Sequence, residues 1–228
     1  MKQFHSLLIL LIFLSGVASS AIASQMDEAL QAFQAGDLPE AINLWTSEAT
    51  AGDSDAQYIL GALHYDGTGV PQSYSEAMKW FQASAEQGYA LAQNALANMY
   101  FSGNGIPTDY ELAVKWWLLA AEKGMPDSQN NVAGAYRDGL GVEKDIEAAI
   151  MWFEKAAFQR DGEAMISLGG VYHEEGNSEM AYVWWYVAGT MGSEDARKNV
   201  EILDSRLSPD QIESAQASAK KILRRINP

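Results

Sequence analysis

The segment Ala77-Met78-Lys79-Trp80 carries an alanine and a tryptophan three residues apart, and this pair returns at fixed intervals along the 228-residue chain. Steps of 36, 36 and 32 residues lead from it to the pairs Ala113 and Trp116, Ala149 and Trp152, and Ala181 and Trp184. A constant period in this range is typical of stacked supersecondary units. The period therefore predicts an all-α fold, an α-solenoid of helix-turn-helix repeats, rather than the core of a globular enzyme.

Each repeat is expected to hold two helices. Helix A is predicted over residues 55–66 and helix B over residues 75–87, because apolar residues recur at helical spacing in both. Gly88 directly follows helix B, as glycine commonly does at helix ends. It returns as Gly124 and Gly192, whereas Arg160 takes its place in the third repeat, which leaves the end of that helix open.

The tryptophans of helix B are interpreted as core residues and not as a stripe that stacks on sugars, because they follow the period of the helix. In the adjacent pairs Trp116–Trp117 and Trp184–Trp185, burial of one tryptophan suffices for the core. Trp117 and Trp185 are therefore the pair members with some chance of being exposed.

The loop between the two helices is repeated as well. Gly67-Thr68-Gly69-Val70 matches residues 103–106 and 139–142, each time with the pattern G-x-G. The pattern could belong to a phosphate-binding loop, but neither nucleotide-binding motif is completed and the loop follows a helix instead of a strand. We interpret the glycines as turn residues with special backbone angles.

The ends of the repeat array differ from its middle. The first and last loops are shortened, to residues 36–39 and 176–178, and the period stops after Gly192. Terminal units of solenoids are commonly atypical because they cap an exposed core. The predicted organisation is a short repeat at 24–53, four repeats at 54–88, 89–124, 125–160 and 161–192, and C-terminal capping helices within 193–228, at 193–203 and 209–226.

The pattern Ala56-x-x-x-Leu60-Gly61-x-x-His64-x-x-Gly67-x-Gly69-Val70, followed by Ala77-x-x-Trp80-x-x-x-x-Ala85-x-x-Gly88, resembles the SLR family of Sel-one-like repeats, relatives of the tetratricopeptide repeat. The resemblance covers about residues 26–192. The chain departs from the family pattern at three positions, with His64 in place of Tyr, Arg160 in place of Gly and Glu143 in place of Pro.

The resemblance implies a right-handed superhelix in which helix A lines the concave face. It also implies an adaptor that assembles other proteins, often at bacterial envelopes. Cysteine-rich relatives are linked to penicillin binding or β-lactamase activity, and this chain, which has no cysteine, matches that branch poorly.

Residues 1–23 are predicted to be a signal peptide. Lys2 precedes the apolar run of residues 7–14, and Ala21-Ile22-Ala23 fits a cleavage site, so the mature chain is expected to begin at Ser24. The run is too short to span a bilayer, which needs about 20 residues. We therefore expect a periplasmic or secreted protein with no stable membrane insertion after cleavage.

The charge of the chain limits its partners. With 15 basic and 30 acidic residues the formal net charge is −15, which opposes binding to nucleic acid. Lys220, Lys221, Arg224 and Arg225 crowd the C-terminus. We interpret them as cations that complement a helix dipole, with a membrane or partner contact as the alternative.

A peptide-binding groove is predicted on helix A. The positions that face the groove in tetratricopeptide-like repeats are Asp55, Tyr58, Ala62, Tyr65, Asp66 and their equivalents at steps of 36 residues. Asn side chains both donate and accept hydrogen bonds along an extended peptide, and aromatic rings anchor it. The candidate binding residues are Tyr58, Tyr65, Asn94, Asn98, Phe101, Asn130 and Arg137. The alternative is that they are ordinary solvated residues of a helix.

An enzyme is the less favoured prediction, and we expect no catalytic residue, metal site or cofactor. His173-Glu174-Glu175 does not complete a zinc motif, and His64 occupies a repeated tyrosine position that indicates packing. Ser218-Ala219-Lys220-Lys221 fits the S-x-x-K motif of penicillin-binding enzymes, but its companion motifs are missing. The sequence therefore predicts an exported, non-catalytic scaffold or adaptor with a protein or peptide partner. The alternative is a hydrolase of cell-wall or β-lactam substrates.

Overall fold

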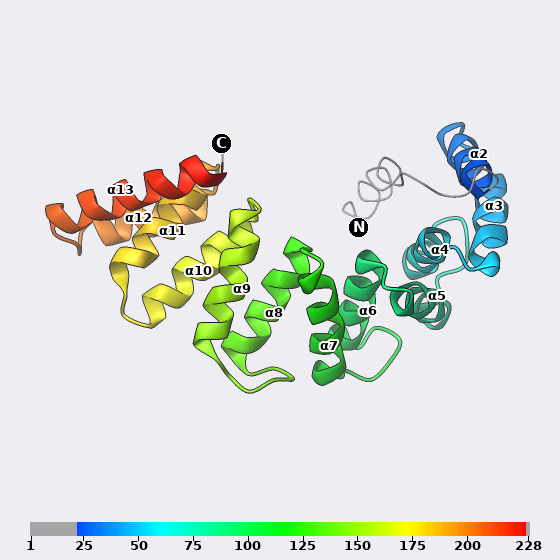
Figure 1. Cartoon of the computed structure of the whole chain (residues 1–228), viewed down its shortest axis with the longest axis horizontal. Coiled ribbons are helices and arrows are strands. Elements are labelled where there is room, and N and C mark those ends of the chain that lie inside the picture. Colours follow the sequence, from blue (N-terminus) through cyan, green and yellow to red (C-terminus); the bar gives the residue numbers. More distant parts are fainter. Residues whose placement is uncertain (1–21, 227–228) are drawn as a thin grey trace. The chain divides into compact units, whose positions relative to one another are not determined.

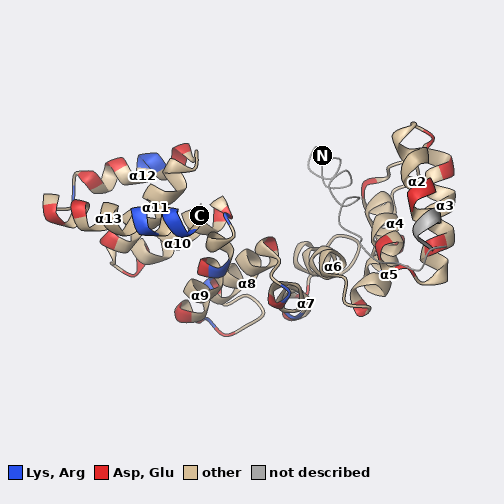
Figure 2. Cartoon of the chain, turned by 45° about the horizontal axis from the view of Figure 1, so that its top comes forward, with Lys and Arg blue, Asp and Glu red and all other residues tan. Residues whose placement is uncertain are grey.

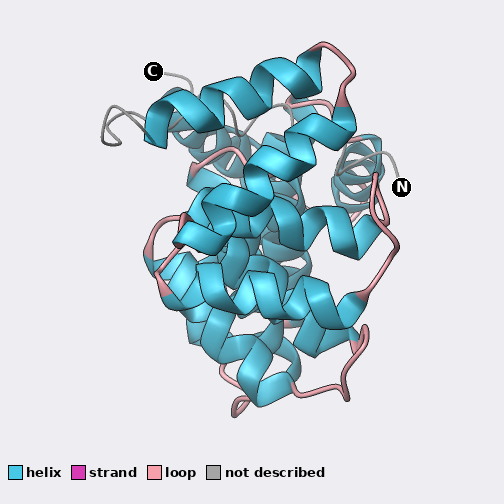
Figure 3. Cartoon of the chain, turned by 90° about the vertical axis from the view of Figure 1, so that its right-hand side faces the viewer, coloured by secondary structure: helices cyan, strands magenta, loops and turns pink. Residues whose placement is uncertain are grey.

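The structure is a computed structural model that describes residues 22–226, and the described part is entirely helical, without a strand (Figure 3). The predicted signal segment lies outside the described residues, apart from its last two positions. The helices follow one another with short connections (Figure 1). They are α2 (Ile22–Gln34), α3 (Leu38–Ala51), α4 (Ser54–Asp66), α5 (Tyr74–Glu86), α6 (Ala90–Ser102), α7 (Tyr110–Glu122), α8 (Pro126–Asp138), α9 (Ile146–Phe158), α10 (Gly162–Glu174), α11 (Ser178–Thr190), α12 (Glu194–Asp204) and α13 (Pro209–Ile226).

The chain divides into two compact units, Met1–Asp109 and Tyr110–Pro228. In the first unit, α2 to α6 pack in sequence order, each helix on the next. In the second unit, α7 to α11 pack in the same way, and α11 also packs against both α12 and α13. The predicted solenoid of stacked helix-turn-helix repeats is confirmed within each unit.

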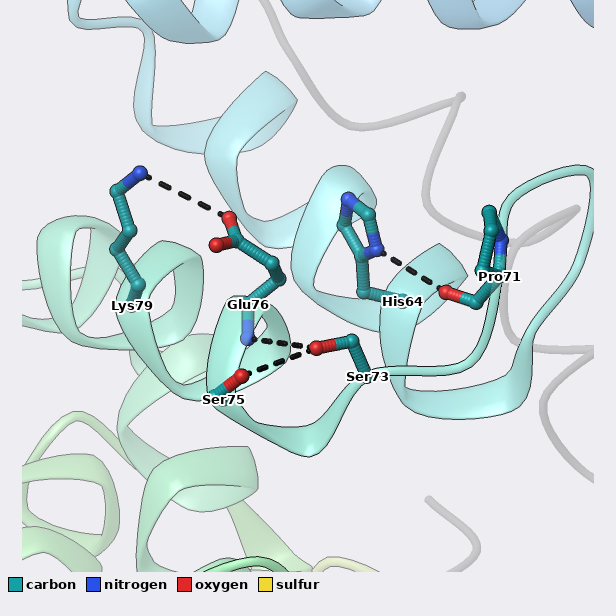
Figure 4. A network of polar contacts seen from close by, with 6 residues as sticks. All are labelled: His64, Pro71, Ser73, Ser75, Glu76 and Lys79. Atoms are coloured by element: carbon teal, nitrogen blue, oxygen red, sulfur yellow. Dashed lines mark hydrogen bonds and ion pairs between the residues drawn. The ribbon is translucent and has the colours of Figure 1, made fainter.

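Short polar side chains set the starts of several helices. The side chains of Asp53, Ser73 and Asp145 accept a hydrogen bond from the backbone N–H three residues on, at the start of α4, α5 and α9. This contact satisfies a backbone donor that has no partner within the helix. Figure 4 shows Ser73 in this role, with Glu76 N–H at 3.3 Å from its hydroxyl oxygen.

Arg160 resolves the open end of the third helix B. It is the one non-glycine residue of the described range with a positive φ, of 73°, and its N–H donates to the carbonyl of Ala157. Gly88 and Gly124 hold the same slot with φ of 88° and 89°. The repeat geometry therefore imposes the left-handed conformation on Arg160 although only glycine adopts it readily.

The core of each repeat is built from alanine and from one aromatic slot. The alanines that define the period are fully buried. The aromatic residue that directly follows the repeated tryptophan is buried as well: Phe81 and Phe153 are 1% exposed, Trp117 is 4% and Trp185 is 7%. The idea that Trp117 and Trp185 have some exposure is therefore wrong. Instead, Trp80 and Trp116 are the partly exposed members of their pairs.

The physical reason is the close approach of helix A to that slot. A Cβ added to Gly61 would lie 2.5 Å from the ring of Phe81, and one added to Gly169 would lie 2.5 Å from Trp185. The aromatic ring thus lies directly against the small residue of helix A, where it is sealed from solvent.

A repeated glutamine ties consecutive helices together and was not singled out in the sequence. Gln57, Gln93 and Gln129 each donate from Nε2 to a carbonyl oxygen near the end of the preceding helix B, at 3.1 Å. Gln87 and Gln159 in turn donate to the Oε1 atoms of Gln57 and Gln129, both at 2.8 Å. Gln57, Gln93 and Gln129 are spaced by 36 residues, and this spacing is the feature of the sequence that indicates a repeated contact.

Candidate functional site

The predicted groove residues of the first unit lie on α4 and α6. Tyr58 is only 3% exposed, with its ring 5.6 Å from that of Phe81 and 5.5 Å from that of Tyr89. Burial and the charge of Asp66 raise the pKa of Tyr58 to about 12. Tyr58 is therefore part of the core and offers a ligand little direct surface.

Tyr65 lies at the surface of the same cluster. It is partly exposed, its ring meets that of Tyr74 edge-on at 5.2 Å, and its hydroxyl accepts a hydrogen bond of 2.6 Å from Nδ2 of Asn104. Asn104 belongs to the glycine loop of the next repeat. Tyr65 thus links two repeats.

An acidic side chain lies at the start of α4. Burial raises the pKa of the Asp55 carboxyl, and a hydrogen bond with the Tyr89 hydroxyl opposes that rise. Burial, with the charge of Asp55 second, raises the pKa of Tyr89. The hydroxyl therefore stays protonated near neutral pH and acts as donor to the carboxylate.

The remaining predicted residues of the first unit lie on α6. Asn94 is partly buried, Asn98 is exposed, and Phe101 is 40% exposed, which is high for a large apolar side chain. The carbonyl of Asn98 accepts a hydrogen bond of 2.7 Å from Ser102. The three residues follow one another along the helix at steps of three and four, and so share one face.

The second unit holds Asn130 and Arg137 on α8. The Oδ1 atom of Asn130 is buried and accepts no hydrogen bond from the residues that the structure describes. Arg137 donates from Nε and from a terminal nitrogen to the two carboxylate oxygens of Asp138, both at 2.7 Å. This bidentate contact raises the pKa of Arg137 and holds that of Asp138 below its usual value.

Two glycines extend this surface along helix A of the second unit. Gly134 lies one turn after Asn130, and Gly170 holds the same slot on α10, 36 residues later. A Cβ added to either would meet no atom within 4 Å. Internal packing therefore does not require glycine at these positions, although each lies inside a helix.

The helix-A surface of the two units carries polar and aromatic side chains. It combines carboxylates, amides and tyrosines, and the described residues contain no group of three His, Cys, Asp or Glu side chains placed to hold a metal ion. His173 is exposed, with its ring 5.5 Å from that of Trp185. His64 is partly buried, with Nδ1 at 3.4 Å from the carbonyl oxygen of Pro71 (Figure 4).

The other sequence candidates lie elsewhere. Ser218 and Lys221 are on α13, and Lys221 is exposed. The basic cluster marks the C-terminal end of α13 (Figure 2), where Arg225 lies 4.3 Å from the centre of the Phe158 ring. Searched over the part of the chain that the structure describes, no helix combines the length and the apolar character needed to cross a membrane.

Sequence reasoning missed several members of this surface. Tyr89 and Asn104 hold Asp55 and Tyr65 by hydrogen bonds that no periodicity announces, since Met125 and Leu140 stand 36 residues beyond them. Gly134 and Gly170 fell on groove positions, but their meaning depends on the empty space around them.

The comparisons with known proteins agree with the repeat pattern. A family model described as Sel1 repeat matches residues 54–89, 90–125, 126–159 and 162–193, which together make up more than half of the chain. No match is found among curated proteins.

Three solved structures are similar. The chain is 29% identical to a protective antigen of uropathogenic Escherichia coli with an SLR fold, at a TM-score of 0.78, over 90% of this chain and 46% of that one. It is 23% identical to a Sel1 repeat protein of Oxalobacter formigenes, at a TM-score of 0.73, over 86% and 84%. It is 21% identical to a putative Sel1 repeat protein of Klebsiella pneumoniae, at a TM-score of 0.51, over 80% and 93%. The chain thus spans less than half the length of the Escherichia coli antigen.

Proposed function

This chain belongs to the Sel1 repeat family, and from that premise we propose that it is an exported, non-catalytic scaffold that binds a peptide segment of a protein partner along helix A. Sel1 repeats generally form protein-interaction surfaces. The proposal concerns the helix-A surface of each unit by itself. The residues are Tyr65, Asn94, Asn98 and Phe101 in the first unit, with Tyr58 supporting them from the core, and Asn130, Gly134, Arg137 and Gly170 in the second.

Two partly exposed glycines of the second unit, Gly134 and Gly170, carry the proposal. Glycine inside a helix costs about 1 kcal/mol relative to alanine. The packing of the chain does not require this cost at Gly134 and Gly170, because a Cβ added to either would meet nothing within 4 Å. A glycine surface lets the backbone of a partner approach the helix closely.

Asn130 supports the same surface. Positions four apart on a helix are neighbours, so Asn130 lies next to Gly134. A buried acceptor without a partner costs about 1–3 kcal/mol, and the Oδ1 atom of Asn130 is such an acceptor. A rotation of this amide on binding would let it pair with a peptide N–H.

A non-catalytic role is supported by what the sequence offers for chemistry. There is no cysteine, and the S-x-x-K segment at Ser218 stands without its companion motifs. No observation favours a hydrolase. Export is supported by the signal-like residues 1–23, and the likeness to a protective antigen is consistent with it.

The experiment is site-specific photocrosslinking in intact cells. A benzoylphenylalanine is placed at Phe101, which is 40% exposed on helix A, or at Leu119 or Met151, which are 43% and 46% exposed on helix B. We expect adducts with a protein partner from Phe101 and not from the two helix-B positions, recovered in the periplasmic or secreted fraction. Equal adducts from helix B, or no adduct from Phe101, would contradict the groove.

Glycine substitutions test the second unit in the same assay, with the photocrosslinker placed at Arg137. Gly134→Gln and Gly170→Gln should each stabilise the protein by about 0.5–1 kcal/mol, because they improve helix propensity, yet reduce adduct formation. Gly162→Ala is the matched control, since a Cβ there also meets nothing within 4 Å, but the residue begins α10. Undiminished adducts in the glutamine variants would show that the glycines do not serve binding.

A further inference from the structure

In three repeats the glycine loop covers the start of the preceding helix B. A Cβ added to Gly69 would lie 2.6 Å from Leu38 and 2.7 Å from Ile42, side chains of α3. In the same way, one added to Gly105 would meet Tyr74 at the start of α5, and one added to Gly141 would meet the backbone of Tyr110 at the start of α7. The second glycine of each loop therefore packs closely against the preceding repeat and also forms part of the turn.

The fourth repeat has no glycine loop over the preceding helix B, but it keeps the hydrogen bond that joins its own two helices. In the regular repeats, the N–H of the residue before helix B donates to a carbonyl of helix A, from Ser73 to His64 at 2.8 Å and from Asp145 to Tyr136 at 2.9 Å. In the fourth repeat Asn177 donates to Tyr172 at 2.8 Å. Eight residues separate Tyr136 from Asp145, but only four separate Tyr172 from Asn177.

A depression of about 1020 Å³ lies where the missing loop would be. Its lining includes Ile146 and Ile150, which stand at the same repeat positions as Leu38 and Ile42. Tyr136, Tyr172 and the short loop at Asn177 form other parts of its wall. The long α8–α9 loop and the short α10–α11 loop lie on one edge of this unit (Figure 1).

The rim of the depression is acidic. Glu143, Asp145, Glu147 and Glu175 line it, and all four side chains are exposed, whereas Lys144 is its one basic residue. Clustered like charges favour a ligand of the opposite sign. A lining that combines two isoleucines with four carboxylates fits an extended segment with an apolar residue and flanking cations.

We propose that this depression, lined by Ile146, Ile150, Tyr136 and Tyr172, binds an extended, basic peptide segment of another protein, which takes the place of the absent glycine loop. A small β-branched side chain, such as Val70 supplies in the first loop, contacts the two isoleucines. Lysine or arginine residues on either side pair with the carboxylates of the rim. The site is separate from the helix-A groove and does not depend on it.

The charge of the chain argues against a second copy as the occupant. Each copy has a net charge of −15, so two copies repel one another. The room left by a deletion of four loop residues also suits an extended segment better than a helix, whose diameter with side chains is about 10 Å.

The test uses synthetic peptides on the mature chain. The probe is Gly-Thr-Gly-Val-Pro, the sequence of residues 67–71, with two lysines added at each end and both termini blocked. Binding is followed by methyl NMR of isoleucine, and we expect saturable shifts of Ile146 and Ile150. The same peptide with glutamates in place of the lysines should bind at least about tenfold more weakly.

A loop-restored variant closes the site. Residues 173–176 are replaced by the sequence of residues 137–144, which restores the 36-residue period. It should abolish the methyl shifts, with folding checked by circular dichroism. If this variant does not fold, the double substitution Glu143→Lys and Glu147→Lys on the exposed rim gives the answer, because it should reverse the preference between the two peptides.

The matched control is Glu194→Lys with Glu201→Lys, an equal charge change at exposed positions of α12. It should leave the preference unchanged. The proposal is overturned if the lysine peptide does not shift Ile146 and Ile150, or if the rim substitutions and the control act alike. A concentration-dependent dimer that the loop-restored variant abolishes would instead assign the depression to a second copy. Asn130→Ala should leave peptide binding intact, which separates this site from the groove.

Discussion

Tyr58 and Tyr65 show how a helical position is divided between core and surface. Both belong to the groove-facing set of helix A, yet Tyr58 is 3% exposed and lies among Phe81 and Tyr89, whereas Tyr65 remains partly exposed. The two residues are seven positions apart on α4 and so share one face of the helix, but the burial of Tyr58 speaks against its predicted contact with a ligand. Which of them the next repeat covers depends on Tyr89, a residue outside the helix.

The burial of Tyr58 predicts an alkaline sensitivity. Its hydroxyl has a pKa of about 12 in the folded protein, compared with 10.0 for an ordinary tyrosine. Between these values the native state keeps a proton that the unfolded chain releases. Stability is therefore lost as the pH rises through that window, by up to about 1.4 kcal/mol per pH unit.

Tyr58→Phe should make this loss shallower by about one proton. The measurement is the free energy of unfolding in urea at intervals from pH 9 to pH 12. Tyr110→Phe, which removes a hydroxyl from a ring that is 40% exposed, is the control. Parallel curves for Tyr58→Phe and the unsubstituted protein would contradict the assignment.

At the scale of elements, the loop glycines have two separate roles. The first glycine of each loop follows helix A with positive φ, as at Gly67 and Gly139, and ends the helix. The second also has positive φ but lies against the preceding repeat. The repeated G-x-G pattern correctly predicted turns. It gave no sign of the contact, because the contacting residue belongs to another repeat.

Gly141→Ala and Gly124→Ala separate these effects. Both residues have positive φ, of 72° and 89°, but a Cβ at Gly141 would strike the backbone of Tyr110, whereas one at Gly124 meets no atom within 4 Å. We expect Gly124→Ala to cost about 1 kcal/mol and Gly141→Ala about 3 kcal/mol. Urea unfolding measures both, and equal losses would show that the second glycine is only a turn residue.

At the scale of the whole molecule, two further helices follow the last repeat, where the sequence predicts a cap. The predicted capping helices, 193–203 and 209–226, correspond to α12 (Glu194–Asp204) and α13 (Pro209–Ile226). Both pack on α11, and Gln216 of α13 donates to the Tyr182 hydroxyl at 3.1 Å. Trp184 and Tyr182 of α11 are each 1% exposed.

Removal of α13 by truncation after Leu207 should therefore uncover an aromatic surface. We expect a red shift of tryptophan emission, a lower melting temperature and a loss of about 3–5 kcal/mol, the range for removing large buried contacts. Lys221→Ala, which removes an exposed charge from the same helix, should leave these properties nearly unchanged. An unaltered emission maximum in the truncated protein would refute the capping role.

The sequence by itself determined the features that repeat. Ala77, Trp80 and the loop glycines recur because each unit must bury the same face against the next, so local pattern and tertiary packing state the same requirement. The all-α repeat architecture and the family follow from this repetition. The assignment of Asn94, Asn98 and Asn130 to partner binding stays a prediction.

Only the tertiary structure decided the features that depend on neighbours distant in sequence. It placed Trp117 in the core, joined Asn104 to Tyr65, and left empty space around Gly134. It also turned a shortened loop into a depression over Ile146 and Ile150. Burial and empty space depend on the residues that surround a position in the folded chain. The repeat period of the sequence identifies equivalent positions, but it does not specify which distant residues surround them.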